Sequence, residues 1–418
     1  MADISMATAG GGTMPVARPV ESSGWTVPAL ADRGRVDAAA VIGIGVALMT
    51  IGVLMTFSAS MGRVRVDFTG DLTDAPAFRQ WIRQAAYVPA GLLLMLVASR
   101  IPYTIWRWRP GRLLQPAVLL FLLAVVLLAL AFVPGIGKTA NGARRWIRLV
   151  PPTDFVLFQP SELAKLSLVV LLSAWYASGT AAMLRVRGFF RGTAVTCLMI
   201  GLLAGLVAKE DLGTGALLAA IGGMLFFAAG ARFWHLMLLG LSLGFGMWHH
   251  LTSRAYRMER LTMFTRIWDD TRDRGYHQVQ SLGTIVSGGW WGRGLGQGIQ
   301  KYGYLPETTN DSVFAVLCEE LGMPGALLVI GLFLALLCVG WRVMRHCADR
   351  FGRLLALGIT LLIVMQAAFN IAVVTVSVPT KGIALPLISA GGSGLLCLSV
   401  MMGILANIAR HRAPALEH

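Results

Sequence analysis

The sequence of 418 residues contains few charged side chains: Asp, Glu, Lys and Arg together make up 14% of it, against about 25% in an average soluble chain. This shortage excludes an ordinary soluble globular protein and a disordered one. Acidic residues are the scarcer kind, 21 against 36 basic residues, for a net charge of +15. Because 56% of the chain is hydrophobic, the composition also argues against a nucleic-acid binder with a hydrated basic surface. What remains is a membrane protein.

Two common kinds of site are also missing from the sequence. The five cysteines form no Cys-x-x-Cys motif and no Cys/His cluster, so no thiolate metal site is predicted. We interpret them as small buried hydrophobic residues. The glycine-rich stretch 288–298 lacks the Gly-Lys-Ser/Thr ending of a phosphate-binding P-loop, so it predicts no nucleotide site.

Long apolar runs are abundant, and at about 20 residues per spanning helix they predict an all-α polytopic membrane protein with about ten transmembrane helices. The ten stretches are 38–59, 82–99, 114–134, 160–177, 193–209, 213–230, 234–251, 312–340, 354–377 and 386–408. Residues 1–37 are predicted to form a flexible cytoplasmic tail, 38–408 the membrane domain and 409–418 a cytoplasmic C-terminal tail. A large extracytoplasmic loop, 252–311, separates the seventh and eighth helices.

The distribution of arginine predicts the orientation. With a cytoplasmic N-terminus, the inner loops and the end of the last stretch hold fourteen arginines, with Asp349 the one acid among them. Basic residues in short loops favour the cytoplasmic side, so both termini are placed in the cytoplasm. Much of the positive charge then serves topology and contact with membrane lipids, and it requires no nucleic-acid partner.

Two of the predicted outer segments are more than connectors. Segment 135–159 carries an excess of positive charge. In loop 252–311, the spacing of apolar and basic residues over 254–268 favours a helix on the membrane surface. The glycine-rich 288–298 is typical of a re-entrant or interfacial segment, whose irregular backbone must be covered by protein or line a wet cavity.

Ionisable residues within the apolar stretches are candidates for function, because charge in a membrane is costly. Glu162 and Lys165 lie three residues apart on one helix face, as a structural ion pair or as ligand contacts. Arg145 and Trp146 suit a phosphate and a sugar or lipid headgroup, or serve as interfacial anchors. Of the adjacent Glu319 and Glu320, at least one should face the bundle interior and a partner.

Two further charged clusters are predicted at the outer ends of the helices. Residues 209–211, Lys-Glu-Asp, are interpreted as a tight turn at the water boundary. Asp269, Asp270 and Asp273 lie among arginines in the large loop. They are either a source of a general base beside a phosphate site or a solvated run of charge, and composition alone does not decide between the two.

Seven motifs, in order, resemble those of the SEDS family of FtsW/RodA/SpoVE-like peptidoglycan polymerases, and the resemblance extends over about 38–408. The motifs are Asn-Gly-Ala-Arg-Arg-Trp (141–146), Phe-Gln-Pro-Ser-Glu-Leu-Ala-Lys (158–165), Asp-Leu-Gly-Thr (211–214), Gly-Tyr (275–276) with Gln-Ser (280–281), Gln-Lys-Tyr-Gly-Tyr-Leu-Pro-Glu (300–307), Glu-Glu-Leu-Gly (319–322), and Pro-Thr-Lys-Gly (379–382) running into Leu-Pro-Leu-Ile-Ser-Ala-Gly-Gly-Ser (385–393). The form of 300–307 and the N-terminal tail are more similar to the FtsW branch than to the RodA branch.

The resemblance implies an enzyme of the bacterial cytoplasmic membrane that polymerises lipid II, a disaccharide-peptide on undecaprenyl pyrophosphate, at the extracytoplasmic face. The family's essential acid precedes the Gly-Tyr pair by five residues, which here is Asp270. It implies that Asp270 is the general base on the acceptor GlcNAc 4-hydroxyl. The substrate- and pyrophosphate-binding residues that it implies are Arg145, Trp146, Glu162, Lys165, Lys381 and Ser393.

The resemblance further implies a class B penicillin-binding protein transpeptidase as partner, because polymer strands must be cross-linked. No cofactor is established, although pyrophosphate chemistry is compatible with a divalent cation such as Mg or Mn. The sequence departs from the family pattern at four positions. They are Thr271 and Glu210 in place of proline, Ala390 in place of an aromatic residue, and Asn310 in place of threonine.

Two alternatives to a glycosyltransferase are a lipid II transporter or flippase and a catalytically silent division scaffold. A transporter should present polar residues at mid-membrane depth in related halves. Here the polar clusters gather at the outer ends of the spans and no convincing internal repeat is present, which favours the glycosyltransferase. The altered residues around Asp270 are what makes the scaffold an alternative.

Overall fold

The structure is a computed structural model that describes residues 27–61, 76–109, 111, 114–140, 143–148, 157–178, 188–252, 264, 267–269, 275–379 and 382–411. Helices dominate these residues. They are α1 (Val27–Met61), α2 (Pro76–Ala98), α3 (Pro116–Leu130), α4 (Pro160–Tyr176), α6 (Val195–Ala208), α7 (Leu212–Ala228), α8 (Phe233–Thr252), α10 (Tyr276–Gly288), α11 (Val313–His346), α12 (Arg350–Val374) and α13 (Gly392–Arg410), with a 3₁₀ turn η1 (Tyr103–Trp106) and a π turn η2 (Phe189–Ala194).

Each of the ten apolar stretches falls on one of these helices, and the protein is a polytopic membrane protein. Within the described residues, five helices are long and apolar enough to cross a membrane by length and composition: α1, α2, α11, α12 and α13. Shorter apolar helical segments, 10–17 residues long, lie on α3, α6, α7 and α8. The number of ten spans therefore stays a prediction. Helix α1 begins at Val27, so the last part of the predicted N-terminal tail is helical.

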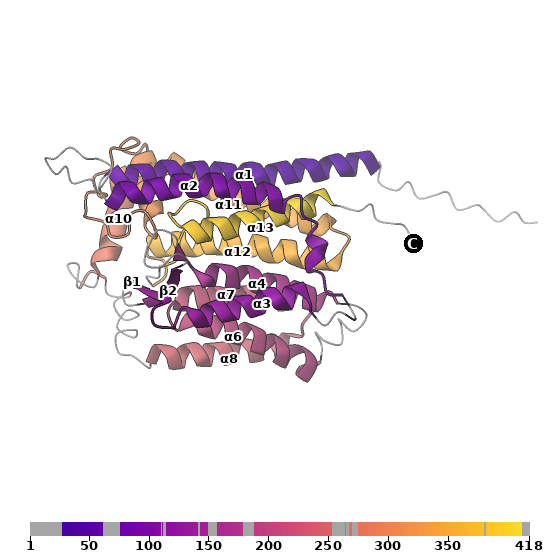
Figure 1. Ribbon diagram of the computed structural model, residues 1–418. Helices are drawn as coiled ribbons and strands as arrows, with labels where there is room; N and C mark the ends of the chain where they lie inside the picture. The colour runs from indigo at the N-terminus through magenta and orange to yellow at the C-terminus, as the bar shows by residue number, and fades with distance from the viewer. Residues whose placement is uncertain are drawn as a thin grey trace, which may run out of the picture.

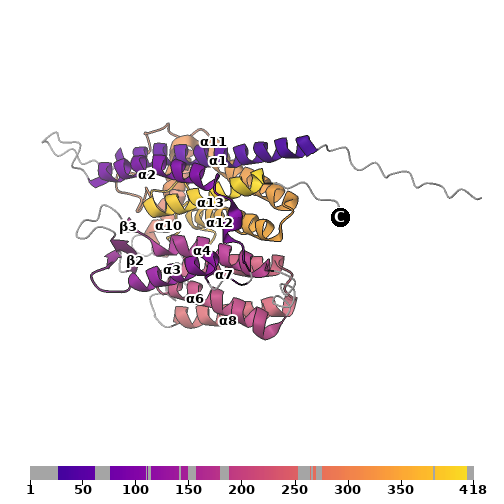
Figure 2. The ribbon, with the colours of Figure 1, turned by 45° about the vertical axis from the view of Figure 1, so that its right-hand side comes forward.

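The long helices lie side by side in one bundle (Figure 1), with α1 and α2 at one edge and α8 at the other. Helix α4 is buried on nearly all sides, as expected for a helix in the centre of a bundle. Helix α8 instead exposes Phe233, Leu241 and Phe245. Large apolar side chains on an outer face suit contact with lipid. Figure 2 shows the same separation of α1 and α8 after a turn of the molecule.

A small antiparallel sheet lies at one end of the bundle, which we call the sheet end; it is the end predicted to be extracytoplasmic. Its strands are β1 (Gly137–Ala140), β2 (Ala143–Arg148) and β3 (Leu157–Phe158), in the order β1-β2-β3. Trp146 pairs with Lys138, and Ile147 pairs with Phe158. The sequence analysis did not anticipate these strands in segment 135–159. They leave the helical class unchanged, and they place β2 beside the start of α4.

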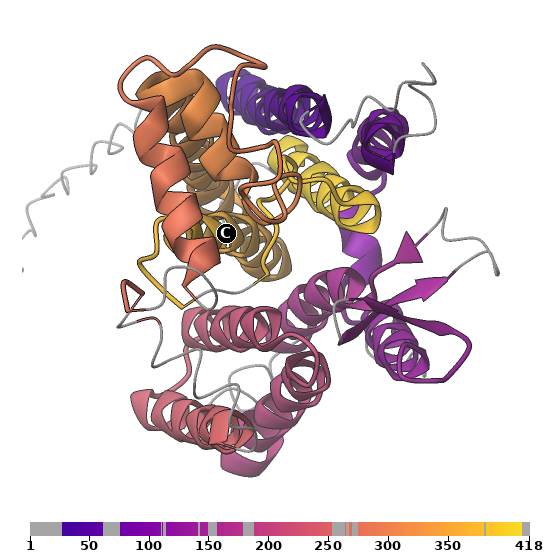
Figure 3. The ribbon, with the colours of Figure 1, turned by 90° about the vertical axis from the view of Figure 1, so that its left-hand side faces the viewer.

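Helix α10 lies across the sheet end of the bundle, and the glycine-rich segment that follows it packs on α11 (Figure 3). Helix α11 is interrupted at Gly322, where φ is 65°. The interruption frees the carbonyls of Glu319 and Glu320, which accept hydrogen bonds from the N–H groups of Arg293 and Gly294 at 2.9 Å each. Most residues of the segment are exposed, among them Trp290, Trp291 and Leu295, so its re-entrant or interfacial placement stays a prediction. The predicted surface helix 254–268 lies mostly outside the described residues.

Glu319 and Glu320 both face the interior, which confirms the prediction for this pair. The Glu320 carboxylate contacts Lys301 Nζ at 2.8 Å and accepts a hydrogen bond of 2.6 Å from the Ser58 hydroxyl. The Glu319 carboxylate accepts the Ile299 N–H at 2.9 Å. These contacts join α1, the segment between α10 and α11, and α11 itself, so the two acids have structural partners away from the site described below.

Candidate functional site

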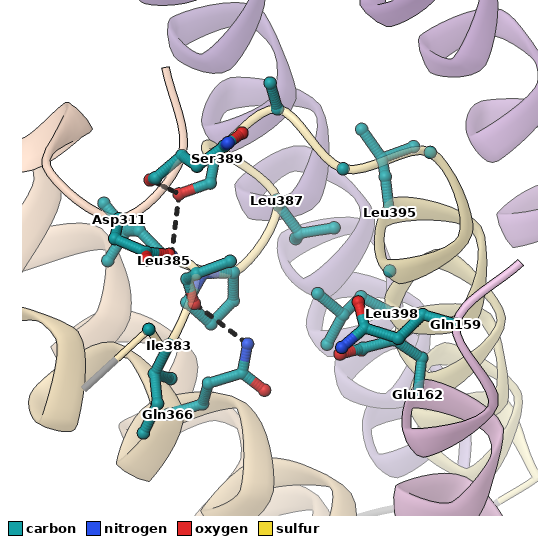
Figure 4. Close-up of a pocket in the computed structure, with 18 of the residues that line it drawn as sticks. Gln159, Glu162, Asp311, Gln366, Ile383, Leu385, Leu387, Ser389, Leu395 and Leu398 are labelled. Atoms are coloured by element: carbon teal, nitrogen blue, oxygen red, sulfur yellow. Dashed lines mark hydrogen bonds between the residues drawn. The ribbon is translucent and has the colours of Figure 1, made fainter. Parts of the chain in front are cut away.

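A cavity of about 450 Å³ lies near the sheet end of the bundle and is lined by both polar and apolar side chains (Figure 4). We call it the polar cavity. Its polar lining comes from seven parts of the fold: α2, β2, the start of α4, the start of α7, the segment before α11, α12 and the segment before α13. The polar side chains are those of Arg83, Gln84, Tyr87, Arg145, Trp146, Gln159, Glu162, Lys165, Asp211, Thr214, Glu307, Asn310, Asp311, Gln366 and Ser389.

Four of the residues singled out in the sequence meet in this cavity: Arg145 and Trp146 on β2, and Glu162 and Lys165 on α4. Ser393 is buried beside it, where its hydroxyl accepts the Gln159 N–H at 3.0 Å. Asp270 and Lys381 lie outside the described residues, so their predicted positions in the site stay predictions.

Lys165 and Glu162 form a close ion pair within the first two turns of α4. Lys165 Nζ lies 2.8 Å from Glu162 Oε2, and only 2% of the lysine side chain is exposed. The ammonium group also donates to Gln366 Oε1 at 2.6 Å. Gln366 in turn donates to the Ala384 carbonyl at 3.0 Å. The pair is therefore a structural ion pair whose side chains also line the cavity, and contact of these side chains with a ligand stays a prediction.

Arg145 is held by the turn between α6 and α7. Its Nε and Nη2 donate to the Glu210 carbonyl at 3.0 and 2.6 Å, and its Nη1 lies 3.6 Å from Asp211 Oδ2. Asp211 also caps α7, because its carboxylate accepts the N–H and the hydroxyl of Thr214 at 3.1 and 2.9 Å. The tight turn predicted at 209–211 is confirmed, and the structure adds that it orients Arg145.

The sequence analysis did not select Asp311 as a site residue, and the structure places it in the cavity wall. Its main-chain carbonyl accepts the Asn370 amide at 2.9 Å. The neighbouring Asn310 amide donates to Glu307 Oε2 at 2.7 Å. The available signal was the family departure at Asn310, which drew attention to this segment without giving its side chains a role.

Asp311 lies where a carboxylate is poorly solvated. The pKa of its carboxyl is raised from 3.8 to about 7, first by burial and then by the nearby carboxylates of Glu307 and Asp211, while the Arg145 guanidinium opposes the shift. Near neutral pH this side chain is therefore divided between its neutral and ionised forms. It can hold a proton inside the cavity.

Replacing Asp311 by Asn should change how stability depends on pH. The folded pKa lies above the unfolded value of 3.8, so the folded protein keeps a proton that the unfolded chain releases. Stability contributed by this group therefore falls as the pH rises from about 4 to about 7. The free energy of unfolding of Asp311→Asn, relative to that of wild type, should therefore rise as the pH increases from about 5 to about 8. The expected rise is on the order of 2 kcal/mol after allowance for partial exposure.

Thermal unfolding in detergent at these two pH values measures the difference, with Asp269→Asn as the control, because Asp269 is exposed. Parallel pH profiles for wild type and Asp311→Asn would contradict the assignment of a proton to Asp311.

The charges of the cavity lining nearly cancel. Three basic side chains, Arg83, Arg145 and Lys165, face four carboxylates, Glu162, Asp211, Glu307 and Asp311. Although four carboxylates line the cavity, no group of three or more His, Cys, Asp or Glu within the described part of the chain is arranged to hold a metal ion. The residues described here do not provide a divalent-cation site, and a need for Mg or Mn stays a prediction.

The comparisons with known proteins agree on one family. The model of the family described as "Cell cycle protein", FtsW/RodA/SpoVE, matches residues 38–414. The chain is 38% identical over 370 residues to a probable peptidoglycan glycosyltransferase FtsW of Geobacter sp. (strain M18), which covers 88% of this chain and 95% of the relative. It is 36% identical over 366 residues to stage V sporulation protein E of Bacillus subtilis (strain 168), which covers 87% and 94%.

A solved structure shares the fold. Its title describes structural coordination of polymerization and crosslinking by a peptidoglycan synthase complex. The matched chain is 26% identical, with a TM-score of 0.64, and the match covers 87% of this chain and 97% of that one. The similarity therefore extends over nearly all of the membrane region that surrounds the cavity.

Proposed function

Because this chain belongs to the FtsW/RodA/SpoVE family of cell cycle proteins, we propose that it is a peptidoglycan glycosyltransferase that polymerises lipid II and binds it in the polar cavity. Relatives named as peptidoglycan glycosyltransferases match it at 35–38% identity over most of its length. The observation that carries the proposal within the fold is the meeting of Arg145, Trp146, Glu162 and Lys165 in one cavity.

The reaction joins two lipid-linked sugars and requires one base on the protein. The 4-hydroxyl oxygen of the acceptor GlcNAc attacks the anomeric carbon of the donor MurNAc and gives its proton to Asp270. The bond from that carbon to the pyrophosphate oxygen breaks, with inversion, and undecaprenyl pyrophosphate leaves with the bonding electrons. Because pyrophosphate is already a stable anion, the leaving group needs stabilisation of its charge more than protonation.

The cavity residues divide the remaining work. Arg145, Lys165 and Lys381 supply positive charge for the pyrophosphate, and Trp146 offers an aromatic face to a sugar ring. Glu162 holds the Lys165 ammonium at 2.8 Å, and Ser393 holds the main chain at Gln159, immediately before α4. These two contacts support positioning roles for Glu162 and Ser393.

We place the protein in the bacterial cytoplasmic membrane, with both termini in the cytoplasm and the cavity open to the extracytoplasmic face. The arginine-rich inner loops support this orientation. A class B penicillin-binding protein is the proposed partner, because the new strands must be cross-linked. A related chain solved within a peptidoglycan synthase complex supports assembly with a second protein.

Incubation of the purified protein with lipid II, with and without a class B penicillin-binding protein, tests the proposal. We expect long glycan strands on a gel, and more of them when the partner is present. If the protein makes no strands in either mixture but moves lipid II across a liposome bilayer, the transporter alternative replaces the proposal. If it does neither, the scaffold alternative does.

A further inference from the structure

The N-terminal end of α13 opens into the polar cavity, since Gly391, Gly392 and Gly394 belong to the lining. Helix α13 begins with Gly392 and has no side chain that caps it among the described residues. The first N–H groups of a helix have no partner within the helix. Here the N–H groups of Gly392, Ser393 and Gly394 receive no acceptor from the described part of the chain. Such an end carries a partial positive charge and attracts anions.

A second donor stands beside this helix end. Gln84 on α2 is only 2% exposed, and its Oε1 accepts the Gly391 N–H at 3.3 Å. Because the atom that accepts this N–H must be oxygen, the other terminal atom, Nε2, is a donor. That nitrogen is buried and has no hydrogen-bond partner among the described residues. A buried amide donor without an acceptor is costly, unless a ligand supplies the acceptor.

The obvious cations of the cavity are less available to an anion than the sequence suggested. Lys165 is paired with Glu162 at 2.8 Å, and Arg145 is engaged by the Glu210 carbonyl and by Asp211. A carboxylate near each cation weakens the field that an incoming anion feels. The uncapped helix end and the Gln84 amide are neutral donors, and both lack acceptors in the described residues.

The side chains next to the helix end include apolar ones besides Gln84, Tyr87 and Glu162. Leu395 and Leu398 of α13 line the cavity together with Leu387. In Figure 4, Leu395 and Leu398 lie on the same side of the cavity as Gln159 and Glu162. A ligand at the start of α13 therefore meets amide donors at one end and leucine side chains along its flank. This combination suits a charged group joined to a hydrocarbon chain.

We propose that the N-terminal end of α13 (Gly391–Gly394) and the Gln84 amide form a pyrophosphate subsite for a prenyl-linked ligand. This proposal rests on the proposed function and deepens it, because it adds main-chain and amide donors to the Arg145 and Lys165 side chains of the same cavity. Neighbouring side chains leave no room for a larger residue at one of these glycines. A Cβ at Gly392 would overlap the Tyr87 ring at 2.5 Å, and one at Gly394 would lie 3.5 Å from Glu162 Oε2.

Gly391→Asp is the most direct test. Gly391 has extended backbone, with φ of −167°, and a Cβ there meets no atom within 4 Å. An aspartate at this position can cap α13 itself, so it should keep or raise the melting temperature while its carboxylate takes the place of the ligand. We expect its affinity for undecaprenyl pyrophosphate to fall about tenfold or more, since the carboxylate removes the favourable interaction of an anion with the helix end. Gln84→Glu should act in the same direction.

The matched control is Ser377→Asp, which adds the same carboxylate at an exposed position at the sheet end, after α12, and should bind like wild type. Equilibrium binding in detergent should compare undecaprenyl pyrophosphate, undecaprenol and inorganic pyrophosphate. Binding of undecaprenyl pyrophosphate alone, weakened by Gly391→Asp, supports the proposal. Equal sensitivity of inorganic pyrophosphate, with no advantage for the lipid, overturns the prenyl-linked ligand. Unchanged affinity in both Gly391→Asp and Gln84→Glu overturns the subsite.

The outcome can be separated from that of the proposed function. If the wild-type protein polymerises lipid II and both variants bind undecaprenyl pyrophosphate with wild-type affinity, the proposed function stands and the proposed subsite is wrong. A wild-type protein that binds the prenyl pyrophosphate through this helix end but makes no glycan keeps the subsite and loses the glycosyltransferase.

Discussion

Asp270→Asn should abolish most of the polymerisation of lipid II, lowering its rate by about a thousandfold. General base catalysis contributes typically 10²–10⁴-fold, and an amide cannot accept the proton of the attacking hydroxyl at this position. Binding of lipid II should change little, because the substitution removes one charge and keeps the size of the side chain. Time courses of polymerisation with purified protein in detergent, read as the amount and length of glycan on gels, measure the loss.

The neighbouring acids provide matched controls for Asp270. Asp269→Asn and Asp273→Asn remove the same charge from the same loop, and both variants should polymerise lipid II within about threefold of wild type, as expected when a charge is removed outside the reacting groups. Polymerisation by Asp270→Asn at the wild-type rate would contradict the assignment. Loss of activity in Asp269→Asn with retention in Asp270→Asn would transfer the role to Asp269.

The second large effect concerns stability and the buried cluster around Lys301. Lys301→Met should lower the free energy of unfolding by about 3–5 kcal/mol, the range seen when one partner of a buried ion pair is removed. Lys301 Nζ contacts Glu320 Oε1 at 2.8 Å and donates to the Ser58 hydroxyl and the Gly296 carbonyl at 2.8 and 2.6 Å. Both side chains of the pair are fully buried, so methionine leaves the Glu320 carboxylate without its cation.

Thermal unfolding in detergent checks this prediction against two controls. Arg107→Met breaks the pair of an exposed arginine with the partly buried Asp349 at 3.7 Å, and should cost less than about 1 kcal/mol. The double variant Lys301→Met, Glu320→Leu removes both charges and should recover much of the loss, because apolar replacements of whole buried pairs are often tolerated. A Lys301→Met protein that unfolds at the wild-type temperature would show that the pair contributes no stability.

Much of the fold follows from local patterns in the sequence. The ten apolar stretches fall on helices because a helix satisfies all its own backbone hydrogen bonds, which a membrane requires of any spanning segment. The Glu162–Lys165 pair could also be predicted from the sequence, since residues three apart share a helix face. The strands of 137–148 could not be predicted, because a short strand of mixed polarity gives a weak sequence pattern beside strongly apolar helices.

The site itself could be predicted only in part from the sequence. Arg145, Trp146, Glu162 and Lys165 stand in recognisable motifs, and the structure brings them together. The partners of Glu320 could not be predicted from the sequence. Lys301 and Ser58 lie far from Glu320 in the chain, and their distances from it along the sequence follow no helix or strand repeat. The same is true of Gln84, whose role depends on contact with Gly391 across the interface of α2 and α13.

By itself, the sequence determined the membrane class, the positions of the helices and the family, because each depends on hydrophobicity and motifs that are local in the chain. The tertiary structure decided which charges meet, Arg145 with Asp211 and Lys301 with Glu320. It also decided that the uncapped N-terminal end of α13 opens into the polar cavity. The physical reason is that a buried charge or donor takes its partner from whichever element packs against it. That packing depends on the whole bundle.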